Sequence, residues 1–255
     1  MKKNHLLCSV LLMLLLILSI SNNIYAKSKK VLVFSKTAGF RHGSAISAGK
    51  KVIEQLGKEN HFDVDTTEDA GVFTSENLQQ YTAIIFLCTT GDVLNDQQQQ
   101  VFERYIRSGG GFVGTHSATD TEYDWPWYGE LVGAYFKSHP PKHQEAVLNI
   151  VDPNNIATAH LPQVWKKTDE LYNFKWIGIN LNILITMDES SYQGGENGEF
   201  HPMSWYHEYS GGRAFYTALG HDNKSFEDPL YVKHLLGGIK YAMGAKPNQL
   251  STSKK

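Results

Sequence analysis

The chain has 255 residues, and its 24 basic side chains are outnumbered by 26 acidic ones, for a formal net charge of −2. Nucleic acids and anionic membrane surfaces bind proteins that carry an excess of positive charge, so neither is expected as a partner. A chain of this length can form one large domain with a hydrophobic core of its own.

The N-terminal segment has the order of a secretory signal peptide. Lys2 and Lys3 precede an apolar run of 15 residues from Leu6 to Ile20, and a polar region ends at Ala26. That run is shorter than the ~20 residues that a helix needs to span a bilayer. We therefore expect residues 1–26 to be cleaved and the protein to be exported, periplasmic or secreted, with no stable membrane span; an uncleaved membrane anchor is the alternative.

Cleavage would leave a domain over 27–245 and a flexible tail over 246–255. The removed segment holds two basic and no acidic residues, so the remaining chain has 24 − 2 = 22 basic residues against 26 acidic ones, a charge of −4. Cys88 would be the one cysteine left, which excludes an internal disulfide. The core alone must then stabilise the fold.

Strands and helices are predicted to alternate from Lys30 to about Leu131. Val31–Ser35 is almost wholly apolar, which is typical of a strand buried on both faces. A polar loop and an amphipathic helix that Ser44 can cap come next. The same order then recurs, with predicted strands beginning near residues 62, 82 and 111 and predicted helices near residues 74 and 95. This alternation predicts a doubly wound, mainly parallel, flavodoxin-like sheet with helices on both faces.

The second half of the chain has a weaker periodicity. Four segments are expected to be strands: 145–152, 182–188, 202–209 and 212–219. The last two flank Ser210-Gly211-Gly212, which predicts an antiparallel hairpin. A final helix is expected over 228–244, with Pro229 in its first turn.

Three polar loops follow predicted parallel strands, where open α/β sheets bind their ligands. They are Lys36–Gly43, Thr89–Asp92 and His116–Asp120. We expect them to line one cleft, although ordinary helix caps and turns are the alternative interpretation. The candidate substrate-binding residues in them are Lys36, Arg41, His42, Thr89, Thr90, Gly91, Asp92 and Asp120.

Histidines and aromatic residues near other strand ends extend this candidate site. Trp205 and His207 share one face of their strand and could place a stacking surface beside a titratable group. Trp125 and Tyr172 could likewise stack on a sugar ring, the alternative for such aromatics being a hydrophobic plug on the sheet. A divalent metal is a possible cofactor, although no zinc motif of fixed spacing occurs. The candidate metal ligands are His116, His139, His143, His207 and His221.

Several motifs together resemble one known family. "KVLVFSKTAGFRH", "FLCTTGDVLNDQQQ", "GGGFVGTHSATDT", "TDELYNF" and "SWYHEYSGGRAFYTALGHD" occur in the order of the ThuA-like, trehalose-utilisation family. The resemblance runs from about Lys30 to Gly244. It implies the fold of class I glutamine amidotransferases and a role in carbohydrate metabolism, with 3-keto sugars as the suggested substrates.

His116 replaces the residue that carries amidotransferase chemistry. In class I glutamine amidotransferases, the turn after this strand reads Gly-x-Cys-x-Gly and carries the cysteine. The resemblance places Gly114-Thr115-His116-Ser117-Ala118 at that turn, with His116 in the position of the cysteine. An imidazole can exchange protons or bind a metal, but it does not form a glutamyl thioester. We therefore do not expect glutamine amidotransferase activity. We expect His116 to point out of the sheet into the cleft, so that its removal leaves the core intact.

These observations favour an enzyme that processes a glycoside or a 3-keto-glycoside, as a lyase, hydrolase or isomerase. A carbon next to a ketone carries an acidic hydrogen, which a histidine or a carboxylate can remove. His116 or His207 would be the base, and His221 or Glu170 the acid.

The expected partner of the site is a small-molecule carbohydrate. Arg41 and Thr89–Asp92 would hold sugar hydroxyls or a developing enolate. A divalent metal bound by the histidines could stabilise the enolate instead. The alternative from another class is a non-catalytic sugar-binding protein that uses the same cleft.

Overall fold

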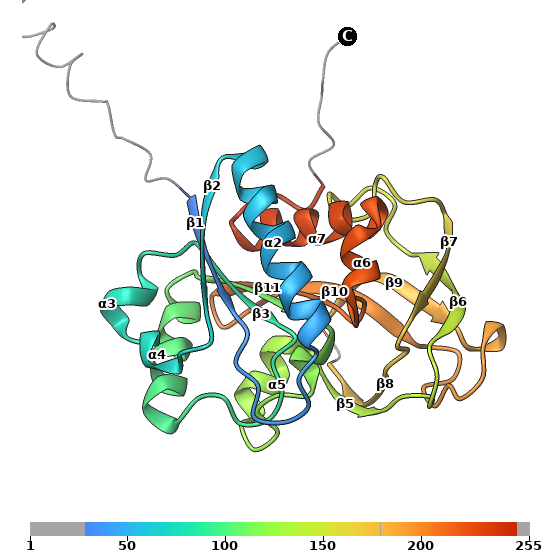
Figure 1. Ribbon diagram of the computed structural model, residues 1–255, viewed down its shortest axis with the longest axis horizontal. Helices are drawn as coiled ribbons and strands as arrows, with labels where there is room; N and C mark the ends of the chain where they lie inside the picture. The colour runs from blue at the N-terminus through green and yellow to red at the C-terminus, as the bar shows by residue number, and fades with distance from the viewer. Residues whose placement is uncertain (1–28, 179, 249–255) are drawn as a thin grey trace, which may run out of the picture.

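The computed structural model describes residues 29–178 and 180–248. Its described strands form a nine-stranded sheet in the order β2-β1-β3-β4-β11-β10-β9-β6-β7 and a separate two-stranded sheet (Figure 1). The first five strands of the large sheet are parallel to one another. They are β2 (Phe62–Thr67), β1 (Lys29–Phe34), β3 (Ala83–Leu87), β4 (Gly111–Thr115) and β11 (Gly212–Thr217).

The other four strands are antiparallel to their neighbours. They are β10 (Pro202–Tyr209), β9 (Asn182–Asp188), β6 (Gln144–Ile150) and β7 (Val164–Asp169). Alternating directions make β7 parallel to β11, so both strands end at the edge of the sheet where β1, β3 and β4 end. The end of β7 lies close to the segment after β11, although three strands separate the two in the sheet. The Asp169 carboxylate accepts a hydrogen bond of 2.8 Å from Ser225 Oγ, which shows that the sheet curls.

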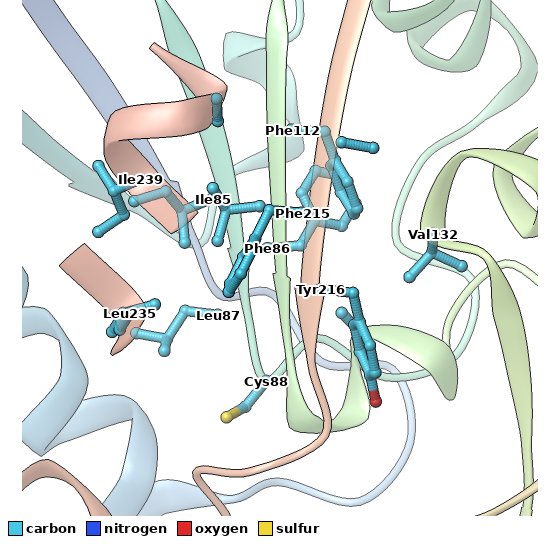
Figure 2. Packing of buried hydrophobic residues seen from close by; sticks show 14 of the residues in the cluster. Ile85, Phe86, Leu87, Cys88, Phe112, Val132, Phe215, Tyr216, Leu235 and Ile239 are labelled. Atoms are coloured by element: carbon cyan, nitrogen blue, oxygen red, sulfur yellow. The ribbon is translucent and has the colours of Figure 1, made fainter. Parts of the chain in front are cut away.

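Helices cover both faces of the parallel half (Figure 1). Ile85 and Leu87 of β3 lie toward α7, whereas Phe86 points to the other face, where its ring is 5.3 Å from that of Phe102 (Figure 2). Successive side chains of a strand therefore pack into two hydrophobic layers, one on each face of the sheet. One layer is covered by α2 (Gly43–Asn60), α6 (Asn223–Glu227) and α7 (Pro229–Ala242), and the other by α4 (Asp96–Arg107) and α5 (Pro126–Val132), with α3 (Ser75–Leu78) beside α4.

Local sequence signals explain where these helices begin. At α4, the Asn95 side chain accepts from the Gln98 backbone and the Gln98 side chain accepts from the Asn95 backbone, which is a capping box. At α7, Pro229 occupies the first turn and the Asp228 side chain caps the helix. The parallel core, the helices on both faces and the antiparallel β10–β11 hairpin confirm the predicted fold class.

The antiparallel half is larger than the sequence predicts. The strand β7 and a small sheet of β5 (Ala134–Ser138) and β8 (Asn173–Ile177) were not expected. β7 buries alternate side chains only, so no apolar run marks it. The short 3₁₀ helices η1 (Ala70–Val72), η2 (His116–Thr119) and η3 (Glu189–Ser191) complete the described elements.

The chain is still tied to the fold at the start of the expected tail. Pro247 O accepts a hydrogen bond of 2.8 Å from Ile156 N, and residues 249–255 lie outside the described residues. The expected signal peptide also lies outside them. Within the described part of the chain, no helix combines the length and the apolar character needed to cross a bilayer.

Candidate functional site

The three predicted loops meet at the carboxyl edge of the parallel strands. Thr37 pairs with Thr90, and Gly91 pairs with Thr121, as isolated bridges that extend the sheet beyond its strands. Gly91 N also donates to Asp120 O over 2.8 Å. The loops after β1, β3 and β4 are therefore joined by backbone contacts, as the order β1-β3-β4 requires.

A strained turn presents His116. β4 ends at Thr115, η2 begins at once, and His116 has a φ of +47°, which is uncommon for a residue other than glycine. Two contacts from β11 and its end hold it: Tyr216 Oη donates to His116 O over 2.7 Å, and Nδ1 lies 2.9 Å from Ala218 O. His116 therefore occupies the tip of a strained strand–turn–helix junction at a strand end.

The expectation that His116 points into an open cleft is wrong, because its side chain is completely buried. The segment that follows β7 covers the turn: the ring of Tyr172 lies 4.2 Å from that of His116, centroid to centroid. That segment reaches the turn because the antiparallel half of the sheet curls back over this edge. Removal of the imidazole would therefore also disturb packing.

Four side chains from four separate loops converge beside this turn. Glu170 Oε2 lies 2.9 Å from His221 Nδ1, 3.2 Å from His116 Nε2 and 3.9 Å from His42 Nε2. His116 Nε2 and His221 Nδ1 are 3.2 Å apart. One donor atom from each of the four residues lies within 4.8 Å of the others. We call His42, His116, Glu170 and His221 the histidine–glutamate cluster.

Hydrogen bonds behind the cluster orient its imidazoles. Ala218 O can only accept, so His116 Nδ1 carries the hydrogen and Nε2 faces the cluster. His42 Nδ1 lies 3.3 Å from Ser117 Oγ, which likewise turns its Nε2 inward. Each of these rings therefore has one nitrogen fixed by the protein and the other directed at Glu170.

Asp169 fixes the two remaining members through the backbone. It is buried, and its carboxylate accepts from Glu170 N over 2.9 Å and from His221 N over 3.2 Å. Gly220 N and Ser225 Oγ also donate to it, over 3.0 and 2.8 Å. One carboxylate thus joins the loop after β7 to the loop after β11. The sequence places Asp169 beside Glu170 but gives no local signal of this role.

The cluster holds a negative charge on Glu170. Burial raises the pKa of Glu170, but the imidazoles of His116, His221 and His42 that face its carboxylate outweigh burial and keep that pKa well below its usual range. Burial also lowers the pKa of His42. For His221, burial lowers the pKa, but the neighbouring Glu170 carboxylate outweighs burial and raises it. Glu170 is an anion at neutral pH and has no proton to donate as an acid.

His139 and His143 lie at the solvent side of the cluster, which we call the rim. Both precede β6, which runs opposite to β7 and so begins at this edge. His139 Nε2 is 3.5 Å from Glu170 Oε1, with 38% of its side chain exposed. The ring of His143, also exposed, lies 4.5 Å from that of His221. Solvent therefore reaches the cluster beside these two side chains.

His207, Trp205 and Trp125 are not brought to the cluster. His207 Nε2 donates to Glu130 O over 3.1 Å, and Trp205 Nε1 donates to Val132 O over 2.8 Å, so both lie against α5. Trp205 and His207 do share a face of β10, but α5 covers that face. Trp125 packs against Phe102 of α4, with ring centroids 6.4 Å apart. We leave these three residues out of the candidate site.

Several predicted substrate-binding side chains hold the loops together instead. Arg41 makes two hydrogen bonds with Glu68, of 2.9 and 3.0 Å, and Lys36 Nζ donates to Val93 O. The hydroxyl of Thr90 donates to Phe40 O, and that of Thr89 bonds the Thr121 hydroxyl. Asp92 is exposed, and Asp120 accepts a hydrogen bond of 2.6 Å from Tyr123 Oη. Tyr172 packs against His116 of the cluster, with the two rings tilted by 34°.

Cys88 offers no replacement for the amidotransferase cysteine. The thiol is fully buried, and burial raises its pKa to about 12. A thiolate is the reactive form of cysteine, so this residue is inert at neutral pH.

One family model matches most of the chain, and solved structures share its fold. The ThuA family, described as trehalose utilisation, matches residues 30–242. A ThuA-like protein from Bacteroides uniformis superposes with a TM-score of 0.73 at 21% identity, covering 87% of this chain and 94% of that one. One from Parabacteroides merdae gives 0.70 at 23%, covering 88% and 92%.

A more distant structural likeness extends to part of a larger enzyme. A β-galactosidase from Bacillus circulans superposes with a TM-score of 0.55 at 13% identity, covering 86% of this chain and 32% of that one. At these identities the likeness concerns the fold alone. No curated protein matches the sequence. The match over most of the chain shows that it belongs to the ThuA family, the family of trehalose utilisation.

Proposed function

We propose that this protein is an exported enzyme that processes a glycoside, and specifically a 3-keto-glycoside, at the histidine–glutamate cluster. The observation that carries the proposal is the convergence of three imidazoles and one carboxylate, from four loops, at the carboxyl edge of the sheet. Such groups stabilise developing charge and exchange protons with a substrate. Membership of a family of trehalose utilisation favours a sugar as that substrate.

The chemistry of a 3-keto sugar suits this arrangement. A base removes the proton from C2, next to the ketone, and the electron pair forms an enolate. In β-elimination the C1–O bond then breaks, a C1–C2 double bond remains, and the leaving oxygen takes a proton. Return of the proton to C2 without bond breakage gives epimerisation or exchange. The cluster would face the ketone oxygen, on which the negative charge develops.

The rim histidines are the best placed to move these protons. His116 is buried and its Nδ1 is bonded to Ala218 O, and Glu170 is ionised. His139 and His143 are exposed and lie next to Glu170 and His221. We therefore assign the proton transfer to one of these two rim histidines and the stabilisation of the enolate to His221 of the cluster, whose charged form the neighbouring Glu170 carboxylate favours by raising its pKa.

The test uses paired substrates in D₂O. The protein is incubated with 3-keto-trehalose and 3-keto-glucosides, and with the same sugars before oxidation. We expect deuterium at C2, or release of the sugar at C1, from the keto forms only. Binding of the sugars without exchange or release would instead identify a non-catalytic sugar-binding protein, and the enzyme proposal would fail.

Export is tested separately. The order of charged, apolar and polar segments in residues 1–26 supports it. Protein isolated from the periplasm or medium of its native host should begin near Lys27. An intact Met1 in protein confined to the cytoplasm would contradict this part of the proposal.

A further inference from the structure

We infer that the histidine–glutamate cluster is a binding site for one divalent transition-metal ion, with zinc the ion that best suits its donors. His42, His116, His221 and Glu170 would be the ligands. The use of the ion in catalysis rests on the proposed function, whereas its binding does not.

The separations of the donor atoms fit a shared ion. Nitrogen and carboxylate oxygen bind zinc at ~2.1 Å, so two ligand atoms of a tetrahedral site lie ~3.4 Å apart. The three contacts of Glu170 Oε2 and the contact between His116 and His221 measure 2.9 to 3.9 Å. No pair of donor atoms exceeds 4.8 Å, so shifts of about 1 Å or less in each side chain bring all four to that spacing.

The hydrogens available do not satisfy these atoms. His116 carries its hydrogen on Nδ1, toward Ala218 O, so in the neutral ring the lone pair of Nε2 faces both His221 Nδ1 and Glu170 Oε2. A hydrogen on His221 Nδ1 serves only one of those two neighbours at a time. A cation at the centre of the cluster would turn these facing lone pairs into four attractive contacts.

The surroundings of the cluster are those of metal-binding histidines. Such histidines donate their second ring nitrogen to a carbonyl or another oxygen, which fixes the ring and its tautomer. His116 does this with Ala218 O, and His42 is placed to do so with Ser117 Oγ. Asp169 fixes the backbone of the other two ligands. The ligands are thus preorganised from behind.

The donor set indicates which ion is bound. Imidazole nitrogens suit zinc and its first-row neighbours, whereas magnesium and calcium prefer oxygen ligands. Three imidazoles and one carboxylate therefore favour a transition metal. His221 and Glu170, with 17% and 10% of their side chains exposed, face the rim, so that side remains accessible for the ion and for a sugar oxygen.

A buried histidine paired with a half-buried carboxylate elsewhere in the fold shows why one such pair does not indicate a metal site. His201 Nδ1 lies 2.7 Å from Glu189 Oε1, and its Nε2 bonds Tyr172 O. Both ring nitrogens are then occupied by the protein. His116 has the same kind of partners, a backbone oxygen and a carboxylate, but in the cluster three imidazoles share the one carboxylate of Glu170.

The experiment measures zinc binding without any sugar. The protein is stripped with a chelator, dialysed, and titrated with Zn²⁺ against a chromophoric chelator; Co²⁺ replaces zinc for absorption spectra. We expect one equivalent of zinc and cobalt bands typical of histidine ligands. Glu170→Gln and His221→Ala should each bind zinc at least ~100-fold more weakly. His207→Gln, which removes a buried histidine outside the cluster, should bind zinc as the unaltered protein does.

The outcomes separate this inference from the proposed function. Failure of the unaltered protein to bind stoichiometric zinc overturns the inference, as does unchanged binding by both cluster variants. Circular dichroism and melting confirm that Glu170→Gln, the more conservative variant, is folded. Zinc binding without turnover of keto-glycosides leaves the inference and removes the function. Turnover by metal-free protein that binds no zinc supports the proposed function and overturns the metal-site inference.

Discussion

The described residues include two groups of buried histidines, which differ in how many imidazoles share one carboxylate. In His201 and His234 both nitrogens have partners in the fold: His234 Nδ1 bonds Ala157 O, and Nε2 lies 3.1 Å from Ser204 Oγ. In His42 and His116 one nitrogen is fixed and the other faces Glu170. Neither burial nor one carboxylate neighbour, which His201 has in Glu189, distinguishes the two groups; the convergence of three imidazoles on Glu170 does.

The two groups of histidines also lie at different places in the fold. His207 lies within β10 and His234 within α7, where neighbouring elements cover them. His116 and His221, in contrast, follow the carboxyl ends of β4 and β11. Side chains at a strand end can meet side chains from other strand ends, because no further strand or helix separates them.

The largest expected effect comes from the cluster. Glu170→Gln keeps the shape of the side chain but removes its negative charge, on which three imidazoles converge. We expect turnover of a 3-keto-glycoside to fall at least ~10³-fold. The loss of a single general acid or base costs ~10²-fold or more. Initial rates with the keto substrate measure this. A variant that keeps a tenth of the activity would place the chemistry elsewhere.

The next effect concerns a histidine of the structural group. Burial lowers the pKa of His234 to about 4, and the neighbouring His160 contributes in the same direction. Unfolding raises that pKa to about 6.5, so the unfolded chain binds the proton first as the pH falls. The stabilisation is complete above pH 6.5 and is lost between pH 6.5 and 4, on the order of 3 kcal/mol.

Denaturant unfolding across that pH range measures this loss. His234→Gln removes the titrating group, so its free energy of unfolding should vary less with pH than that of the unaltered protein. His61→Asn is the control, because His61 is exposed at a helix end with a φ of +58°, which Asn tolerates. Equal pH dependence in His234→Gln and the unaltered protein would contradict the prediction.

A smaller effect is expected at Asp169, which positions the cluster without belonging to it. Asp169→Asn keeps an acceptor oxygen for some of its four hydrogen bonds but removes the charge. Changes behind metal ligands typically cost 10- to 100-fold in affinity or activity. We expect a loss of that size in both zinc affinity and turnover. A loss of stability with unchanged affinity would make Asp169 structural only.

The smallest effect tests the boundary between the two groups. His207→Gln retains a donor for Glu130 O and lies against α5, away from the cluster. We expect turnover within about twofold of the unaltered protein, since changes remote from a site rarely affect it. A loss as large as that of Glu170→Gln would return His207 to the active site.

The sequence predicts the parallel core well because its signals are local. β1 and β3 are apolar runs, an amphipathic pattern marks α4, and a glycine-containing turn marks the β10–β11 hairpin. The antiparallel half has weaker signals, and β7 alternates buried residues with exposed ones such as Lys166. A half-buried edge strand of that kind resembles a polar loop in sequence.

For the candidate site as well, the sequence predicts local positions but not long-range contacts. His116 and His221 could be placed at strand ends, and Glu170 was recognised from its motif. Their mutual contact depends on the curl of the sheet, which no local pattern specifies. The side-chain period of β10 predicts that Trp205 and His207 share a face, but it does not say that α5 covers that face. Long-range packing therefore decided which candidates met.

The strand at the middle of the large sheet, β11, is also the last strand to be synthesised. Until it inserts between β4 and β10, His116 lacks the bonds from Tyr216 and to Ala218, and His221 has no place beside it. A nascent chain ending before β11 therefore cannot assemble the cluster. Such non-local pairing slows folding. A ligand that requires all four loops stabilises only the completed chain, so during biogenesis it selects finished molecules over partly folded ones.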